Sequence, residues 1–155
     1  MIELHEVIVE KQSIRGKRRA RKLALQALYQ WLMSSHELFE IEAQFRVANN
    51  MDKVDSEYFN RLLYGVPEQV KLLEENLMPF LDRSIESLNP IELTVLRLGA
   101  FELLFCPEIP YRVVLDESIS LAKEFGSQDG HRYVNGVLNN LAQQVRKIEI
   151  SLHNE

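Results

Sequence analysis

Apolar residues recur every three to four positions along most of the chain, which is the spacing of amphipathic helices. In the first such pattern, residues 16–34, Leu23, Leu28 and Trp31 share one side of the expected helix. Six further patterns follow, at residues 37–49, 55–65, 68–82, 90–106, 111–125 and 129–149. Short loops between long helices predict an all-α bundle. Residues 1–14 lack this periodicity and are expected to form an irregular arm.

The clearest helix start lies at Asn89, which is a suitable N-cap, with Pro90 and Glu92 in the first turn. The helix that follows is apolar on nearly every side, as a buried central helix would be. Asp129 is the expected N-cap of the last helix. Gly136 lies inside that helix at a propensity cost of about 1 kcal/mol relative to alanine, and close packing against another helix would explain it. We expect one domain over residues 15–150, with halves at about 15–82 and 88–150.

Positive charge is concentrated near the start of the chain. Residues 11–22 read KQSIRGKRRARK and include seven of the 18 basic residues, whereas the rest of the chain has 11 basic and 23 acidic residues, a net charge of −12. Arg15, Arg18, Lys22, Gln26 and Tyr29 fall within about a quarter of the helix circumference. A local cationic face on an acidic protein suggests that it holds a phosphate backbone. Arg21 lies near the apolar margin, with its head group expected in water.

No pattern in the sequence indicates an enzyme. The chain has no glycine-rich phosphate loop and no CxxC, HExxH or GxSxG motif. A single cysteine, Cys106, and four dispersed histidines give no metal-ligand spacing, so neither a metal nor another cofactor is expected. The acidic first ten residues differ from a signal peptide, and no apolar run approaches the ~18 residues of a membrane span. A cytoplasmic protein is expected.

Three segments of the sequence carry a resemblance to a known family. RRARKLALQALYQW near the start, ELTVLRLGAFELLF in the middle and LAKEFGSQDGHRYVNGVLNNLA near the end resemble the bacterial NusB family, in the expected order over residues 16–146. The resemblance implies a NusB-like fold of about seven helices in two packed three-helix bundles. It also implies a transcription antitermination factor that binds boxA RNA, notably of rRNA operons, together with the ribosomal protein NusE. NusA, NusG and RNA polymerase would be indirect partners.

The resemblance and the basic helix face together predict the binding residues. The RNA surface is expected at the starts of the first and last helices: Arg15, Lys17, Arg18, Arg19, Arg21, Lys22, Gln26, Tyr29, His131, Arg132 and Tyr133. Cations would hold phosphates while aromatic rings stack on bases. The NusE surface is expected on the other side, around Glu86 and Glu92. This chain has Gly130 where the family usually has serine, which removes a hydroxyl near the expected RNA, and it has about ten extra residues before the basic run.

Other readings of the same residues remain open. The chain is also compatible with a helical protein-interaction adaptor, whose basic segment contacts an acidic protein, or with an RNA-binding module that serves a separate RNA-modifying enzyme. Tyr29 and Tyr133 are also compatible with positions at the edge of the core, with their hydroxyls in water. The sequence fits a monomer or a homodimer.

Overall fold

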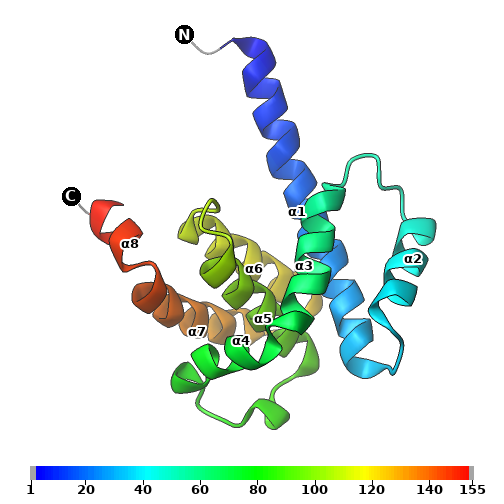
Figure 1. Ribbon diagram of the computed structural model, residues 1–155. Helices are drawn as coiled ribbons and strands as arrows, with labels where there is room; N and C mark the ends of the chain where they lie inside the picture. The colour runs from blue at the N-terminus through cyan, green and yellow to red at the C-terminus, as the bar shows by residue number, and fades with distance from the viewer. Residues whose placement is uncertain (1–2, 154–155) are drawn as a thin grey trace. The chain divides into compact units, whose positions relative to one another are not determined.

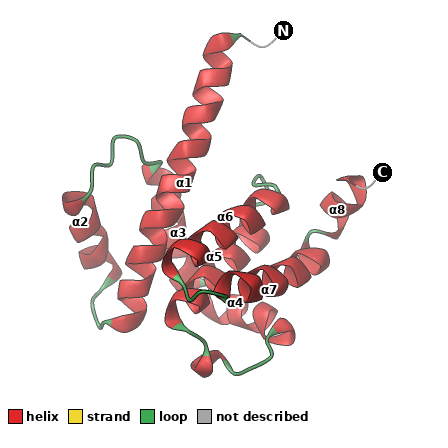
Figure 2. Cartoon of the chain, turned by 180° about the vertical axis from the view of Figure 1, so that it is seen from behind, coloured by secondary structure: helices red, strands yellow, loops and turns green. Residues whose placement is uncertain are grey.

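The computed structural model describes residues 3–153, which contain eight α-helices, two short 3-10 helices and no strand (Figures 1 and 2). The helices are α1 (Leu4–Met33), α2 (Leu38–Ala48), α3 (Ser56–Glu68), α4 (Val70–Leu77), η1 (Met78–Phe80), η2 (Ile85–Ser87), α5 (Pro90–Phe105), α6 (Tyr111–Phe125), α7 (Gly130–Val145) and α8 (Lys147–His153). The predicted all-α fold is confirmed. The chain forms two compact units that divide between Gly65 and Val66, earlier than the predicted boundary between residues 82 and 88.

Helix α1 begins at Leu4, so the prediction of an irregular arm is wrong for residues 4–14; Met1 and Ile2 lie outside the described residues. The β-branched residues of this stretch weaken its helix propensity and blur its periodicity. However, it has no proline, and it continues a helix that packing already stabilises. Adding turns to an existing helix avoids the cost of nucleation. The first turns of α1 extend beyond α2 and α3 (Figure 1).

Three other predicted boundaries differ from the structure. Gly65 does not interrupt α3, which continues to Glu68 with Pro67 in its last turn. The helix predicted over 68–82 ends at Leu77 and passes into the 3-10 turn η1 around Pro79, the predicted break. The last predicted helix is divided in two at Arg146. Such differences of a few residues arise where tertiary contacts override local propensity.

In the first unit, α2 and α3 are joined by a polar network around Arg46. Its guanidinium pairs with Glu42 at 2.8 Å and donates to Asn60 Oδ1 at 3.0 Å. The hydroxyl of Tyr64 donates to the second oxygen of Glu42 at 2.6 Å. This hydrogen bond is the largest cause that lowers the pKa of Glu42, with Arg46 acting in the same direction. The ionised form of Glu42 therefore stabilises the folded state.

Replacing Glu42 with glutamine is expected to lower the free energy of unfolding by about 0.5–1 kcal/mol at pH 7. Because the folded-state pKa lies below the ordinary value of 4.5, this stabilisation is present above that value and is lost as the pH falls through the folded-state pKa. Urea unfolding of wild type and Glu42→Gln at pH 7 and pH 3 should show a difference in the free energy of unfolding that is smaller at pH 3. An equal difference at both values would refute the role of the charge.

In the second unit, α5 is the central helix and packs against α4, α6 and α7. It is buried from Leu93 to Leu103, as its apolar sequence predicted. Asn89 caps it by accepting from the backbone N–H groups of Ile91 and Glu92 at 2.9 and 3.3 Å, so this predicted cap is confirmed. Asp129 is the N-cap residue of α7, as predicted, but its side chain makes no capping hydrogen bond to the helix.

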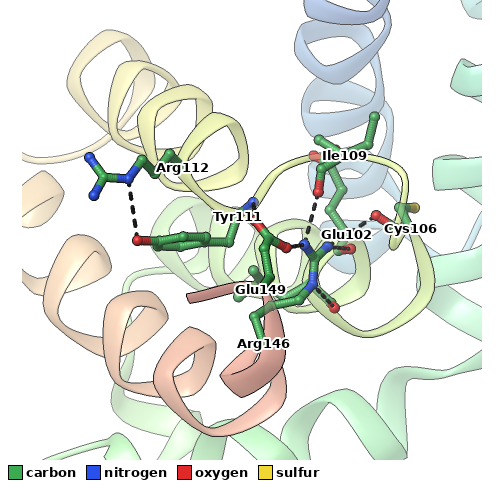
Figure 3. Close-up of polar contacts among 8 residues, drawn as sticks. Glu102, Cys106, Ile109, Tyr111, Arg112, Arg146 and Glu149 are labelled. Carbon is green, nitrogen blue, oxygen red and sulfur yellow. Dashed lines mark hydrogen bonds and ion pairs between the residues drawn. The ribbon is translucent and has the colours of Figure 1, made fainter. Parts of the chain in front are cut away.

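Arg146, at the junction of α7 and α8, joins that junction to the end of α5 (Figure 3). Its side chain is buried and donates to four backbone carbonyl oxygens at 2.9–3.1 Å, those of Glu102, Leu103, Cys106 and Ile109. Glu149 pairs with the same guanidinium and accepts from the N–H of Tyr111 at 2.8 Å. One cation thus satisfies carbonyl groups at the C-terminal end of α5, where the helix dipole is negative.

The close packing expected at Gly136 is wrong: apart from the adjacent residues and backbone of α7 itself, no heavy atom would lie within 4 Å of a Cβ atom at this position. We therefore expect Gly136→Ala to raise the free energy of unfolding by about 0.5–1 kcal/mol, because alanine loses less backbone entropy in a helix. For a protein of this size the midpoint of thermal unfolding should rise by about 1–4 °C. A lower midpoint would mean that position 136 is crowded in solution.

Candidate nucleic-acid interface

The outward side of α1 displays most of the predicted RNA-binding residues of the first unit. Ala20, Ala24 and Leu28 are buried on the opposite side and fix the orientation of the helix. The exposed cations are Arg15, Arg18, Arg19 and Lys22, followed along the helix by the half-buried Gln26 and Tyr29. We call these six residues the basic face of α1. It offers cations for phosphates, an amide for base edges and a ring for stacking.

Two of the predicted RNA-binding cations contact other parts of the first unit. The ammonium group of Lys17 lies 3.2 Å from a carboxylate oxygen of Asp55 and 5.5 Å from the ring of Tyr58. Arg21 is only 4% exposed and lies against the same ring, with its guanidinium carbon 5.4 Å from the ring centroid. The expectation that the head group of Arg21 lies in water is therefore wrong. Both cations hold α1 against Tyr58, which favours a structural role for them.

In the second unit, Tyr133 near the start of α7 is already stacked on one side. The guanidinium of Arg83 lies 4.6 Å from the centroid of its ring, and the Tyr133 hydroxyl accepts from the backbone N–H of Asp82 at 3.3 Å. Partial burial is the largest cause that raises the pKa of Tyr133, whereas the hydrogen bond from Arg83 lowers the pKa of Asp82. Sequence reasoning missed Arg83, because its partner lies fifty residues away and no local pattern connects them.

Glu92, in the first turn of α5, contacts the segment that leads into α7. Its carboxylate accepts from the hydroxyl of Ser127 at 2.7 Å, just before α7. A Cβ atom at Gly130 would lie 1.5 Å from Glu92 Oε1, so the missing side chain makes room for this carboxylate. Glu92 therefore lies beside the start of α7, near residues predicted to bind RNA, and its contact with NusE stays a prediction.

The remaining predicted residues of the second unit are distributed as follows. Glu86 is exposed in η2, Arg132 is exposed in the first turn of α7, and His131 is half-buried. The Nδ1 atom of His131 is buried and has no hydrogen-bond partner among the described residues. The two acidic residues predicted for NusE thus differ: Glu86 is open to solvent, whereas Glu92 is engaged with Ser127.

The described part of the chain contains no group of three or more His, Cys, Asp or Glu side chains arranged to hold a metal ion. Within residues 3–153, none of the helices is both long enough and apolar enough to cross a membrane.

Residues 18–143 match the model of the NusB family. The chain belongs to this family. A NusB-family protein of Legionella pneumophila (strain Corby), named transcription antitermination protein NusB, is 75% identical over 147 residues, which are 95% of this chain and all of that protein. A protein of the same name from Pseudomonas entomophila (strain L48) is 52% identical over 134 residues, or 86% of this chain and 81% of that protein.

Solved NusB structures have the same fold. A crystal form of T. maritima NusB aligns with a TM-score of 0.71 and 26% identity, over 82% of this chain and 90% of that chain. NusB in a crystal structure with NusE and double-stranded RNA aligns with a TM-score of 0.75 and 25% identity, over 84% of this chain and 98% of that chain. The NusB-like fold predicted from sequence is confirmed. The protein is a transcription antitermination factor of the NusB family and not an enzyme.

Proposed function

We propose that the protein binds the boxA element of nascent transcripts, notably those of rRNA operons, together with the ribosomal protein NusE. In this role it would join NusA, NusG and RNA polymerase in the cytoplasm, as a monomer or as a homodimer whose RNA faces pair when empty. The observation that carries the proposal is the basic face of α1, an exposed row of four cations followed by Gln26 and Tyr29, in a protein whose overall charge is −5.

The charge distribution supports a nucleic acid as the ligand. The overall negative charge would repel RNA from most of the surface, so attraction has to be local. The exposed cations of α1 follow one another within about two turns of helix, which suits the repeated charges of a phosphate backbone. Gln26 and Tyr29 lie at the end of this row, where they can meet a base that the cations have brought to the surface.

In the second unit, Arg132 and the pair formed by Arg83 and Tyr133 are proposed to take part. Arg83 covers one side of the Tyr133 ring and is exposed. A base can therefore stack on the outer side of the guanidinium plane, or displace Arg83 and stack on the ring itself. Exposed Glu86 is the proposed direct contact with NusE. Glu92 would join that contact by exchanging its hydrogen bond with Ser127 for one with the partner.

The proposal is tested by fluorescence anisotropy of a labelled boxA-like RNA over a range of salt concentrations, with and without NusE. We expect weak, salt-sensitive binding that becomes tighter and sequence-selective when NusE is added. Because the solved NusB–NusE complex contains double-stranded RNA, the same RNA in duplex form is measured in parallel. Tighter binding of the single strand would support recognition by stacking, since bases in a duplex are not free to stack on side chains.

Two outcomes would contradict the proposal. Binding of NusE without any binding of RNA would leave a helical protein-interaction adaptor. Equal binding of every single-stranded sequence, with or without NusE, would indicate a general RNA-binding module instead of boxA recognition.

A further inference from the structure

A hollow of about 630 Å³ lies in the first unit, lined by the N-terminal half of α1 and by the loop that joins α2 to α3. The loop approaches α1 closely at Gly16, whose carbonyl oxygen accepts from the backbone N–H of Asp55 at 3.1 Å. The volume of the hollow falls within the range of roughly 300–1,000 Å³ that is common for binding sites of small molecules. We call this hollow the extension pocket.

The walls of the extension pocket carry an excess of positive charge. Its charged lining residues are Arg15, Arg19, Lys53, Asp52 and Asp55. Asp55 is already neutralised within the fold, because Lys17 pairs with it at 3.2 Å and the N–H of Tyr58 donates to its other oxygen at 3.0 Å. Three cations thus face Asp52 as the remaining acidic group of the lining, which favours an anionic ligand.

The rest of the lining suits a nucleotide in particular. Gln12 and Ser13 add polar groups that can bond to a base edge, and Val9 adds an apolar surface. A nucleotide presents these same three chemistries, since it has a charged phosphate, polar edges and an apolar base plane.

The extension pocket is continuous with the basic face of α1. A second hollow of about 240 Å³ shares Arg19 and Val54 with it and is lined further along α1 by Lys22 and Gln26. Together the two hollows follow α1 from Val9 to Gln26, a rise of about 25 Å along the helix axis. A strand bound on the basic face can therefore continue into the pocket without leaving α1.

One wall of this pocket lies outside the part of the chain that the family model matches. That match begins at residue 18, whereas Val9, Gln12, Ser13 and Arg15 precede it. We propose that the extension pocket holds one nucleotide of the same RNA strand, next to the nucleotides on the basic face. This inference rests on the proposed function and extends the RNA footprint beyond the family-matched residues.

The test compares three single-stranded RNAs: a boxA-like one, the same RNA lengthened by three nucleotides at its 5′ end, and the same RNA lengthened by three nucleotides at its 3′ end. The protein variants are Gln12→Glu, which puts a negative charge into the pocket, and Lys11→Gln as its control. Both variants change the net charge by −1 at adjacent positions of α1, but Lys11 does not line the pocket. Circular dichroism checks that both variants keep the helical fold.

For wild type, lengthening at one end should raise the affinity about fivefold at 0.1 M salt, as expected for one more neutralised phosphate. The Lys11→Gln variant should keep this gain, whereas Gln12→Glu should lose it and still bind the short RNA. As a second measurement, 4-thiouridine in the added nucleotides should crosslink to residues 9–16.

If wild type binds the short RNA but gains no affinity when the RNA is lengthened at either end, this inference is overturned and the proposed function stands. Equal loss of the gain in both variants would also overturn it, because it would reveal a general charge effect. If Gln12→Glu instead weakened only the binding of NusE, the pocket would belong to a protein partner. Absence of binding to all of the RNAs would overturn the proposed function together with this inference.

Discussion

Replacement of Arg146 by methionine is expected to lower the free energy of unfolding by about 3–5 kcal/mol, because it removes a buried charged donor from its hydrogen-bond partners. Methionine fills a similar volume but donates nothing, so the carbonyl oxygens of Leu103 and Ile109 lose their contact with the guanidinium. Glu149 loses its ion-pair partner as well. The midpoint of thermal unfolding, followed by circular dichroism at 222 nm, should fall by roughly 6–20 °C.

Arg112→Met is the matched control for this prediction. Arg112 lies in the same cluster (Figure 3) but is exposed, and its contact there is a hydrogen bond of 3.3 Å to the Tyr111 hydroxyl. The Arg112→Met substitution removes the same charge and should change the free energy of unfolding by no more than about 0.5 kcal/mol. Similar losses in both variants would show that the net charge matters here and not the buried hydrogen bonds.

Simultaneous replacement of Arg15, Arg18 and Lys22 by alanine is expected to weaken RNA binding about 100-fold at 0.1 M salt. On single strands, each neutralised phosphate contributes about −0.7 to the slope of log affinity against log salt. Loss of three contacts should therefore make that slope shallower by about 2, which corresponds to about two factors of ten at 0.1 M. Alanine is the best helix former, so α1 should stay folded.

The control for the triple variant removes three exposed lysines from the second unit: Lys71, Lys123 and Lys147. The change in net charge is the same, but none of the three belongs to the proposed RNA surface. For this control variant, the slope of log affinity against log salt should equal that of wild type when both are measured by anisotropy over the same salt series. If both triple variants lost affinity equally, RNA would be attracted by the overall charge of the protein, and the basic face of α1 would have no special role.

Local features of the fold were predictable from the sequence because their causes are local. The cap at Asn89 and the buried helix α5 depend on residues within a few positions of one another. The outward direction of Arg15, Arg18 and Lys22 follows from the helical repeat alone. The start of α1 at Leu4 was missed, because weak periodicity does not prevent a helix from continuing beyond a stabilised segment.

Features that depend on distant residues could not be predicted in this way. The burial of Arg21 requires the ring of Tyr58, and the stacking of Tyr133 requires Arg83. Each pair joins segments that only the folded chain brings together. Glu92 shows the same limit, because its position in sequence reveals its place in the first turn of α5 but not its hydrogen bond to Ser127.

The contact between Glu92 and Gly130 also limits how this protein can have changed during evolution. A serine at position 130 would place its Cβ atom where the Glu92 carboxylate now lies. Glu92 would have to rotate away and give up Ser127. The two positions are therefore epistatic: a side chain at residue 130 would release the glutamate, whereas glycine lets it stay bound. Replacing Gly130 with serine would therefore alter the acidic group on α5 without any substitution there.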